Sequence, residues 1–264
     1  MFEVGWTQAS GLRAESRQSE ARLMPVASPA QPARAYEMLC ALAAHLTAMG
    51  CHPVIVDGST QESGEWRQAA GSHMGLLQVL NDASLAGLDR PSDESEWLVI
   101  PGALGLQALQ QTARAAGAQV ALSRLLAPFG AKVVVLLYAP AATLVSILAG
   151  MPVQIMVPVL PQKQASIDAY ASLKALYAGG FSPVLAPLEQ SDVVAELPLQ
   201  QVVRTVVDCA RRHLDLEASI WPLHTWGLRV QEAALGVPMP SVQRSDAWAE
   251  AQGMRPWTAQ TSWS

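Results

Sequence analysis

The stretch MPVASPAQPARAYEMLCALAAHLTAMGCHPVIVD, from Met24 to Asp57, decides how this chain folds. It begins with a short apolar segment, MPVAS, which predicts a buried strand. After a loop, apolar residues at helical spacing predict a helix that ends at Gly50. The segment HPVIVD then predicts a second buried strand. A strand, a loop, a helix and another strand in this order are typical of an α/β protein.

The loop between the first strand and the helix is where many α/β proteins hold phosphate groups. Glycines there allow backbone N–H groups to converge on the phosphates, and a lysine meets their charge. Residues Ser28 to Tyr36 include neither Gly nor Lys, and Pro29 and Pro32 have no N–H to donate. The sequence therefore predicts the frame of a nucleotide-binding protein without the groups that hold a nucleotide tightly.

The composition sets limits on the function. The chain has 264 residues, which suits one α/β domain with tails or two small domains. Half of the residues are apolar and 15% are charged, so we expect a large core. A net charge of −5 without a long basic run argues against nucleic acid as a partner. Cys40, Cys51 and Cys209 are odd in number and far apart, which indicates reduced thiols in a cytosolic protein, and no signal peptide is recognisable.

One uncharged run, Val133–Gln162, is long enough to be considered as a membrane span. Proline and glycine residues interrupt it, which favours a different interpretation. We expect a strand at Val133–Tyr138, a helix at Ala141–Leu148 and a strand at Val153–Val159. Parallel strands that are buried on both faces have continuous apolar sequences of this kind.

The rest of the chain continues this alternation. Strands are expected at 97–102 and 181–188, and helices at 104–116, 119–128, 167–178 and 199–214. Ser166 is expected to cap the third of these helices, with Asp168 in its first turn. Strands that alternate with helices predict a mostly parallel sheet with helices on both faces.

Three parts of the chain are distinguished by composition. Residues 1–22 are polar and form an N-terminal segment, residues 23–214 form the α/β domain, and residues 215–264 form a C-terminal tail rich in Trp and Pro. The tail holds five of the eight tryptophans and one expected helix near Trp226–Leu235. Two roles remain open for these tryptophans, which either anchor a partner or membrane surface or cover an edge of the core.

The sequence predicts no catalytic residues and no metal site. Cys51 and His52 are adjacent, but zinc needs three or four ligands and only His45 and His73 are nearby in sequence. The chain also lacks the G-x-S-x-G sequence of a nucleophile elbow.

Four stretches carry a resemblance to a known family. TQASGLR, at Thr7–Arg13, resembles a DQAxxLR motif, and SIDAYASLKAL, from Ser166, resembles the pattern S-x-x-D-A-Y-A-x-x-K, with Asp168, Tyr170 and Lys174 matching. The stretch 26–57 and the segments GLLQVLN and WLVIPGALGLQAL add to the match. Over residues 7–214 the chain resembles the MinD/ParA family of deviant Walker ATPases, and most closely its flagellar-number regulators, FlhG and FleN.

This resemblance implies a P-loop NTPase architecture of the SIMIBI/MinD type. It also implies that the N-terminal segment binds the flagellar SRP-type GTPase FlhF through Gln8, Ala9, Leu12 and Arg13, although Thr7 replaces the family's Asp. Other flagellar or polar proteins are further expected partners. The implied location is the cytoplasm, including the periphery of the inner membrane or the cell pole.

The same resemblance shows how the nucleotide site departs from the family. Ser28 and Asp57 match, whereas the positions of both lysines, the Mg²⁺-binding hydroxyl, the second Asp of a D-x-D pair and the Walker B Asp are held by Ala30, Ala35, Tyr36, Ser59 and Tyr138. The degenerate loop retains Ser28, Arg34 and Asp57. No tightly bound cofactor is predicted, although a helix N-terminus still attracts anions and leaves weak ATP binding open.

Three functions follow as alternatives. The first is a non-hydrolysing MinD-like regulator, a pseudo-ATPase that controls flagellar number or placement by binding other proteins. The second is an active ATP-binding MinD/ParA-type ATPase. The third is a pseudo-ATPase of another secretion or positioning system, such as cellulose synthesis.

Overall fold

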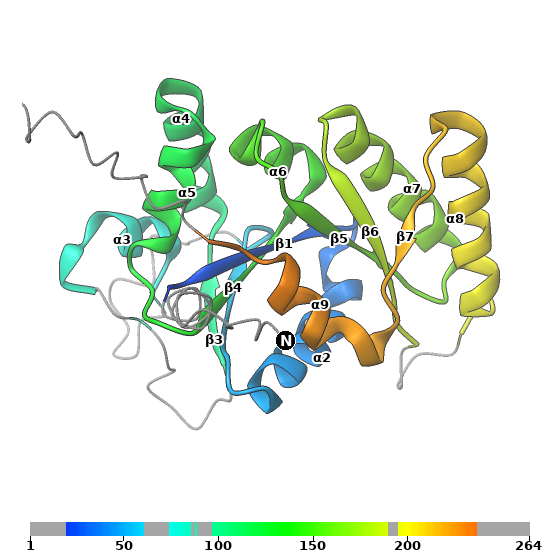
Figure 1. Cartoon of the computed structure of the whole chain (residues 1–264), viewed down its shortest axis with the longest axis horizontal. Coiled ribbons are helices and arrows are strands. Elements are labelled where there is room, and N and C mark those ends of the chain that lie inside the picture. Colours follow the sequence, from blue (N-terminus) through cyan, green and yellow to red (C-terminus); the bar gives the residue numbers. More distant parts are fainter. Residues whose placement is uncertain (1–19, 61–73, 86–87, 89–96, 190–194, 237–264) are drawn as a thin grey trace, which may run out of the picture.

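The computed structural model describes residues 20–60, 74–85, 88, 97–189 and 195–236, and these residues form an α/β fold (Figure 1). The sheet is parallel except for β8, which pairs antiparallel with β1. The strand order is β3 (Leu98–Pro101), β2 (His52–Asp57), β4 (Val133–Pro140), β1 (Arg22–Ser28), β5 (Gln154–Val159), β6 (Ser182–Pro187) and β7 (Ser219–Ile220), with β8 (Leu235–Gly236) beside β1. The predicted fold class, a mostly parallel sheet, is confirmed.

Helices cover both faces of this sheet. The 3-10 helix η1 (Pro32–Ala35) leads into α2 (Tyr36–Ala48), and the remaining helices are α3 (Leu76–Asn81), η3 (Ala83–Leu85), α4 (Ala103–Ala116), α5 (Ala118–Leu126), α6 (Ala141–Leu148), α7 (Lys163–Ala178), α8 (Leu199–Leu214), η4 (Leu223–Thr225) and α9 (Trp226–Ala233). Helices α4 to α8 pack in a row, each against the next, whereas α2 packs with α9 (Figure 1). Right-handed crossovers place these two groups on opposite faces.

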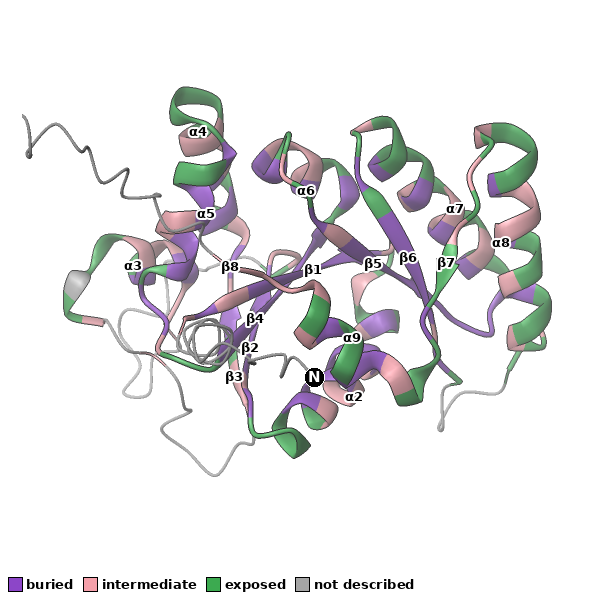
Figure 2. Cartoon of the chain, viewed as in Figure 1, coloured by how far each residue is buried: buried purple, intermediate pink, exposed green. Residues whose placement is uncertain are grey.

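The uncharged run forms the strand, helix and strand that its proline and glycine residues predict. Strand β4 is buried from Val133 to Ala139, and β5 is buried from Ile155 onward (Figure 2). Continuous burial follows from the position of both strands within the sheet, where neighbouring strands and helices cover them on every side. Among the described residues, no helix combines the length and apolar character needed to cross a membrane.

The predicted start of α7 is wrong by one turn. The helix begins at Lys163 with Gln162 as its N-cap residue, so Ser166 is not the cap and Asp168 lies in the second turn. The physical reason is a carboxylate that is distant in sequence. Oε2 of Glu196 accepts a hydrogen bond from the backbone N–H of Lys163 at 3.1 Å, which satisfies one of the free donors of the first turn.

The described part of the C-terminal segment adds structure to the sheet. Strand β7 extends it beyond β6, and β8 pairs with the beginning of β1. Helix α9 matches the one helix expected near Trp226–Leu235. Trp221 and Trp226 are buried, and Nε1 of Trp226 donates to the carbonyl of Trp221 at 2.7 Å. These two tryptophans therefore cover the core, while Trp248, Trp257 and Trp263 lie outside the described residues.

Candidate functional site

The carboxyl ends of three neighbouring strands bring the predicted site residues together. Tyr138 of β4 lies opposite Val26 of β1 on one side and Asp57 of β2 on the other. Ser28, the last residue of β1, lies opposite Pro140. Ligands of open α/β sheets bind at the carboxyl ends of the strands, so this edge is the place to examine first.

Asp57 organises the turn that follows β2. Its Oδ1 accepts hydrogen bonds from the backbone N–H of Ser59 at 2.9 Å and from the Ser59 hydroxyl at 2.6 Å, and its Oδ2 accepts from the Thr60 hydroxyl at 2.7 Å. The backbone N–H of Gly58 donates to the carbonyl of Tyr138 at 2.8 Å, and a Cβ at Gly58 would collide with Leu106. Both carboxylate oxygens are therefore engaged within the chain, and the turn is packed against β4.

Tyr138 fastens the loop after β1 to the sheet. Its side chain is fully buried, and its hydroxyl donates a hydrogen bond of 2.6 Å to the carbonyl oxygen of Pro32. Burial, followed by the nearby Asp57 carboxylate and by Tyr36, raises the pKa of Tyr138 well above its ordinary range. The phenol is consequently neutral at physiological pH and keeps the proton that it donates to the loop.

A second tyrosine lies in the same place. Burial, and then the charges of Asp57 and Cys40, raises the pKa of Tyr36 to about 12. Since Asp57 influences Tyr36 and Tyr138 alike, these three side chains converge although they come from three separate elements. The site thus holds two phenols and one carboxylate.

The loop itself is closed by further contacts. Nη1 of Arg34 donates to Oε1 of the buried Gln162 at 3.1 Å, which links the loop to the start of α7. The cavity between Pro29, Arg34 and α7 has a volume of about 10 Å³, close to the minimum that holds one water molecule. The hydroxyl of Ser28 is buried and has no hydrogen-bond partner among the described residues.

The predicted residues of α7 differ in position. Asp168 lines the small cavity beside Pro29 and Arg34 and accepts a hydrogen bond from Gln164 at 3.0 Å. Tyr170 contacts the His213 ring edge-on at 6.4 Å between centroids. Lys174 is exposed on the same helix. The residues Gln8, Ala9, Leu12 and Arg13 all lie outside the described part of the chain.

The cysteine and histidine pair does not form a ligand cluster. The thiol sulfur of Cys51 accepts a hydrogen bond from Nε2 of Gln231 at 3.2 Å, and the cysteine is free of any disulfide. Within the described ranges, no group of three or more His, Cys, Asp or Glu residues is arranged to hold a metal ion. His73 lies outside those ranges.

Two contributors to this edge are not identified by sequence reasoning. In the sequence, Gln162 is only the last residue of an uncharged run, although a single polar residue between an apolar strand and a helix is a signal for a buried contact. For Pro32, the sequence shows only that proline has no N–H to donate. The role of its carbonyl as an acceptor has no signal in the sequence, because every residue carries a carbonyl.

Comparisons with known proteins gave matches in structure alone. No family model and no curated protein matches the chain. The chain is similar to a variant of Cyanothece McdA in complex with ATP, with 15% identity, a TM-score of 0.49, and coverage of 82% of this chain and 89% of that one. It is similar to a plasmid partition protein from Borrelia burgdorferi, with 9% identity, a TM-score of 0.48, and coverage of 81% and 97%.

A third match is cobyrinic acid a,c-diamide synthase from Mycobacterium smegmatis with bound ADP and magnesium. It has 18% identity and a TM-score of 0.47, and the alignment covers 73% of this chain and 82% of that one. Similarities at this level concern the overall fold.

Proposed function

We propose that this chain is a MinD/ParA-like regulatory protein that acts by binding other proteins and does not hydrolyse a nucleotide. One observation carries the proposal. The hydroxyl of Tyr138 donates to the carbonyl of Pro32 at 2.6 Å and holds the loop against the edge of the sheet at which a nucleotide would bind. The loop is thus fixed by a side chain of the protein in place of a ligand.

The residues at this edge do not fit a magnesium nucleotide. Triphosphate binding needs converging N–H donors and a cation, whereas Pro29 and Pro32 donate nothing and Arg34 bonds Gln162. A magnesium ion prefers carboxylate, hydroxyl and water ligands, but both oxygens of Asp57 accept bonds from the adjoining turn. The cavity beside Pro29 and Arg34 has a volume of about 10 Å³, close to that needed by a single water molecule.

The proposed partner is the flagellar SRP-type GTPase, bound through the N-terminal segment that includes Gln8, Ala9, Leu12 and Arg13. The support for this part is the resemblance of TQASGLR to the family motif. A role in flagellar number or placement follows from the same resemblance. Genes for the flagellar GTPase next to this gene would favour that role, whereas genes for cellulose synthase would favour a secretion system.

Nucleotide binding is tested by calorimetric titration of Mg-ATP into the full chain. We expect a dissociation constant weaker than about 100 μM, which corresponds to roughly −5.5 kcal/mol. Tighter binding would favour the active ATPase. The variant Tyr138→Phe loses the bond to Pro32, and Tyr177→Phe, on the exposed end of α7, is its matched control. Tighter binding of Mg-ATP by Tyr138→Phe alone would show that the closed loop limits nucleotide binding.

The partner is tested separately, by the GTPase rate of an FlhF-type protein with and without the full chain. We expect stimulation by the wild type and its loss in the double variant Leu12→Ala, Arg13→Ala. The control Ser16→Ala, Arg17→Ala removes one arginine from the same segment outside the motif. An unchanged GTPase rate with the wild type would reject this partner.

A further inference from the structure

A larger cavity lies at the other end of the sheet, between α9 and the amino ends of β5 and β7. Its volume is about 380 Å³, which falls within the range of ligand-binding clefts. Gln154, the first residue of β5, and Ser219, the first residue of β7, line it from the sheet. Arg229 and Glu232 line it from α9. We call this space the α9 cavity.

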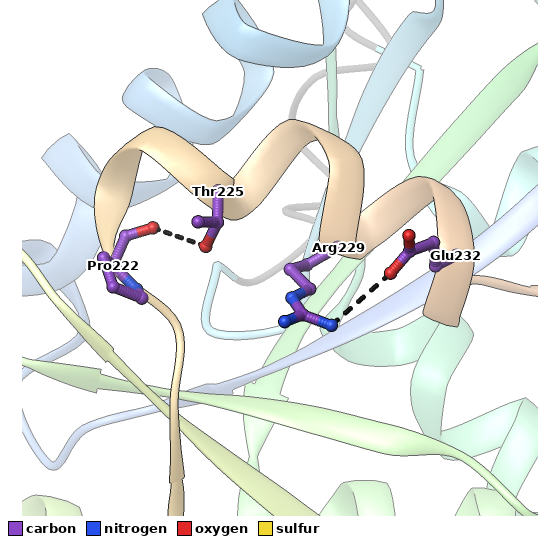
Figure 3. Close-up of polar contacts among 4 residues, drawn as sticks. All are labelled: Pro222, Thr225, Arg229 and Glu232. Carbon is purple, nitrogen blue, oxygen red and sulfur yellow. Dashed lines mark hydrogen bonds and ion pairs between the residues drawn. The ribbon is translucent and has the colours of Figure 1, made fainter.

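The α9 cavity presents a cation and an anion side by side. Nη1 of Arg229 lies 3.6 Å from Oε2 of Glu232, and both side chains extend from the same side of α9 (Figure 3). This separation exceeds the length of a charge-assisted hydrogen bond, and the side chains are 56% and 69% exposed. A guanidinium carries five N–H donors and a carboxylate about four acceptor sites, which is more than one ion pair uses. Both groups can therefore bind a ligand without leaving each other.

The rest of the lining is uncharged. Ile220, Trp221 and Ala233 have apolar side chains, whereas Gln154 offers an amide and Ser219 offers a hydroxyl. A simple ion would be attracted by one member of the ion pair and repelled by the other, and it would make no use of the apolar residues. A ligand with two opposite charges and a larger uncharged part fits this lining better.

Contacts near both ends of α9 hold the ion pair in place. Directly before the helix begins, the hydroxyl of Thr225 donates to the carbonyl of Pro222 at 2.8 Å (Figure 3). Near its end, the carbonyl of Gln231 accepts a hydrogen bond of 2.8 Å from Nη1 of Arg22 in β1, and Nε2 of Gln231 donates to the sulfur of Cys51. A ligand therefore meets walls that are already formed, which lowers the cost of binding.

We propose that the α9 cavity binds a free α-amino acid as its zwitterion, with the carboxylate against Arg229 and the ammonium group against Glu232. The two charged groups of an α-amino acid stand on one carbon atom, so they are close enough to meet a cation and an anion that lie 3.6 Å apart. The guanidinium meets a carboxylate in a planar, two-point geometry, and the ammonium group donates to the carboxylate of Glu232. The side chain of the ligand then occupies the remaining space beside the apolar residues and Gln154. This site goes beyond the function proposed above and does not depend on it.

Nuclear magnetic resonance titration of the full chain with L-phenylalanine, L-leucine and L-glutamine tests the proposal. We expect at least one of them to bind with a dissociation constant below about 5 mM. The amide of that amino acid lacks the carboxylate and its N-acetyl form lacks the ammonium group, so each should bind about tenfold more weakly. No binding of the three amino acids at about 20 mM, or equal binding of either derivative, would reject the proposal.

Substitutions of the two charged residues should have effects of the same sign. Arg229→Gln and Glu232→Gln are each expected to weaken binding about tenfold, which corresponds to about 1.4 kcal/mol. Effects of opposite sign would identify a site for a simple anion or cation and would overturn the proposal. Arg211→Gln is the matched control, because Arg211 and Asp208 form an exposed pair on α8 at 3.9 Å, with the same spacing along the helix and outside the lining of the α9 cavity. An equal loss of affinity in this control would contradict a role for Arg229.

The location of the ligand is tested at Ala233. Ala233→Leu adds bulk to the lining of the α9 cavity while both charged residues remain, so binding should be lost. Ala142→Leu, at an exposed position on α6, is the control and should bind as the wild type does. Circular dichroism checks that the Ala233 variant is folded, and undiminished binding by the folded variant would place the amino acid elsewhere and reject the proposal. If the variant does not fold, the effects at Arg229 and Glu232 decide the matter on their own.

Discussion

The two ends of the sheet differ in how their polar groups are satisfied. At the carboxyl ends of β1, β2 and β4, Asp57 and Tyr138 are paired within the chain and the cavity is about 10 Å³. At the amino end, between β7 and α9, the α9 cavity of about 380 Å³ is lined by Arg229, which forms a long, exposed ion pair with Glu232. The larger of these two cavities therefore lies away from the edge at which open α/β sheets usually bind ligands.

This difference also separates stability from binding. Groups that are buried and paired contribute to folding, and losing one partner leaves the other unsatisfied. Groups that are exposed and loosely paired contribute little to folding and remain accessible to a ligand. Substitutions at the carboxyl end should therefore change the free energy of unfolding strongly. Substitutions of the exposed pair at the amino end should change it little.

The largest effect is expected for Tyr138→Ala. Removing a fully buried aromatic side chain creates a cavity and costs about 3–5 kcal/mol. Tyr177→Ala, at a position that is 41% exposed, is the control and should cost less than about 1 kcal/mol. Urea unfolding of both variants measures the difference, and comparable losses would show that the carboxyl end is not closed by packing.

Asp57→Asn should have the next largest effect. The carboxylate accepts three hydrogen bonds from Ser59 and Thr60, and bonds to a charged group contribute more than neutral ones. We expect a loss of about 2 kcal/mol in the free energy of unfolding. Asp168→Asn, where the carboxylate accepts one exposed bond from Gln164, is the matched control and should change little. Similar midpoints in urea for the two variants would argue against a structural role of Asp57.

Alkaline solution provides a smaller and more specific test. Burial, and then the nearby Asp57 charge, raises the pKa of Tyr36 from 10.0 to about 12 and raises that of Tyr138 further. Between pH 10 and about pH 12 the unfolded chain has lost the phenolic protons, whereas the folded chain has kept them. The free energy of unfolding therefore falls as the pH rises above about 10. Below pH 10 the contribution is complete.

The measurement compares urea midpoints at about pH 9 and about pH 11. The double variant Tyr36→Phe, Tyr138→Phe has no such phenols and should lose less stability over this interval than the wild type. An identical loss in both proteins would mean that other groups account for the alkaline dependence.

The smallest effect on stability is expected at Arg229 on α9. Arg229→Gln should change the free energy of unfolding by less than about 1 kcal/mol, because both members of the ion pair are more than half exposed. Thermal unfolding in low and high salt measures this change. A larger, salt-sensitive loss would show that the pair supports the fold, and the contrast between the two ends would then fail.

Sequence patterns predicted the central strands because their apolar runs leave few alternatives. The helix Ala141–Leu148 and the helix Leu199–Leu214 have the same bounds in the structure as in the prediction. The turn at Asp57 follows a general rule, since a short polar side chain after a buried strand often bonds the backbone that follows it.

Contacts between distant residues were beyond prediction. The bond from Tyr138 to Pro32 joins a side chain to a carbonyl 106 positions away, and the carboxylate of Glu196 moves the start of α7 from 33 positions away. Strands β7 and β8 are two residues each, too short to show a period of two. The α9 cavity depends on the short elements β7 and α9, so no sequence pattern indicated it.

The pairing of β8 with β1 has a consequence for how the protein is made. Arg22 donates to the carbonyl of Gln231, 209 positions later, and Leu23 pairs with Leu235 in the same region. Strand β1, the first described strand to leave the ribosome, therefore waits for almost the last described residues before its amino end is complete. Such long sequence separation slows folding and keeps the early strands exposed during synthesis. A nascent chain that stops before α9 should remain a target for chaperones.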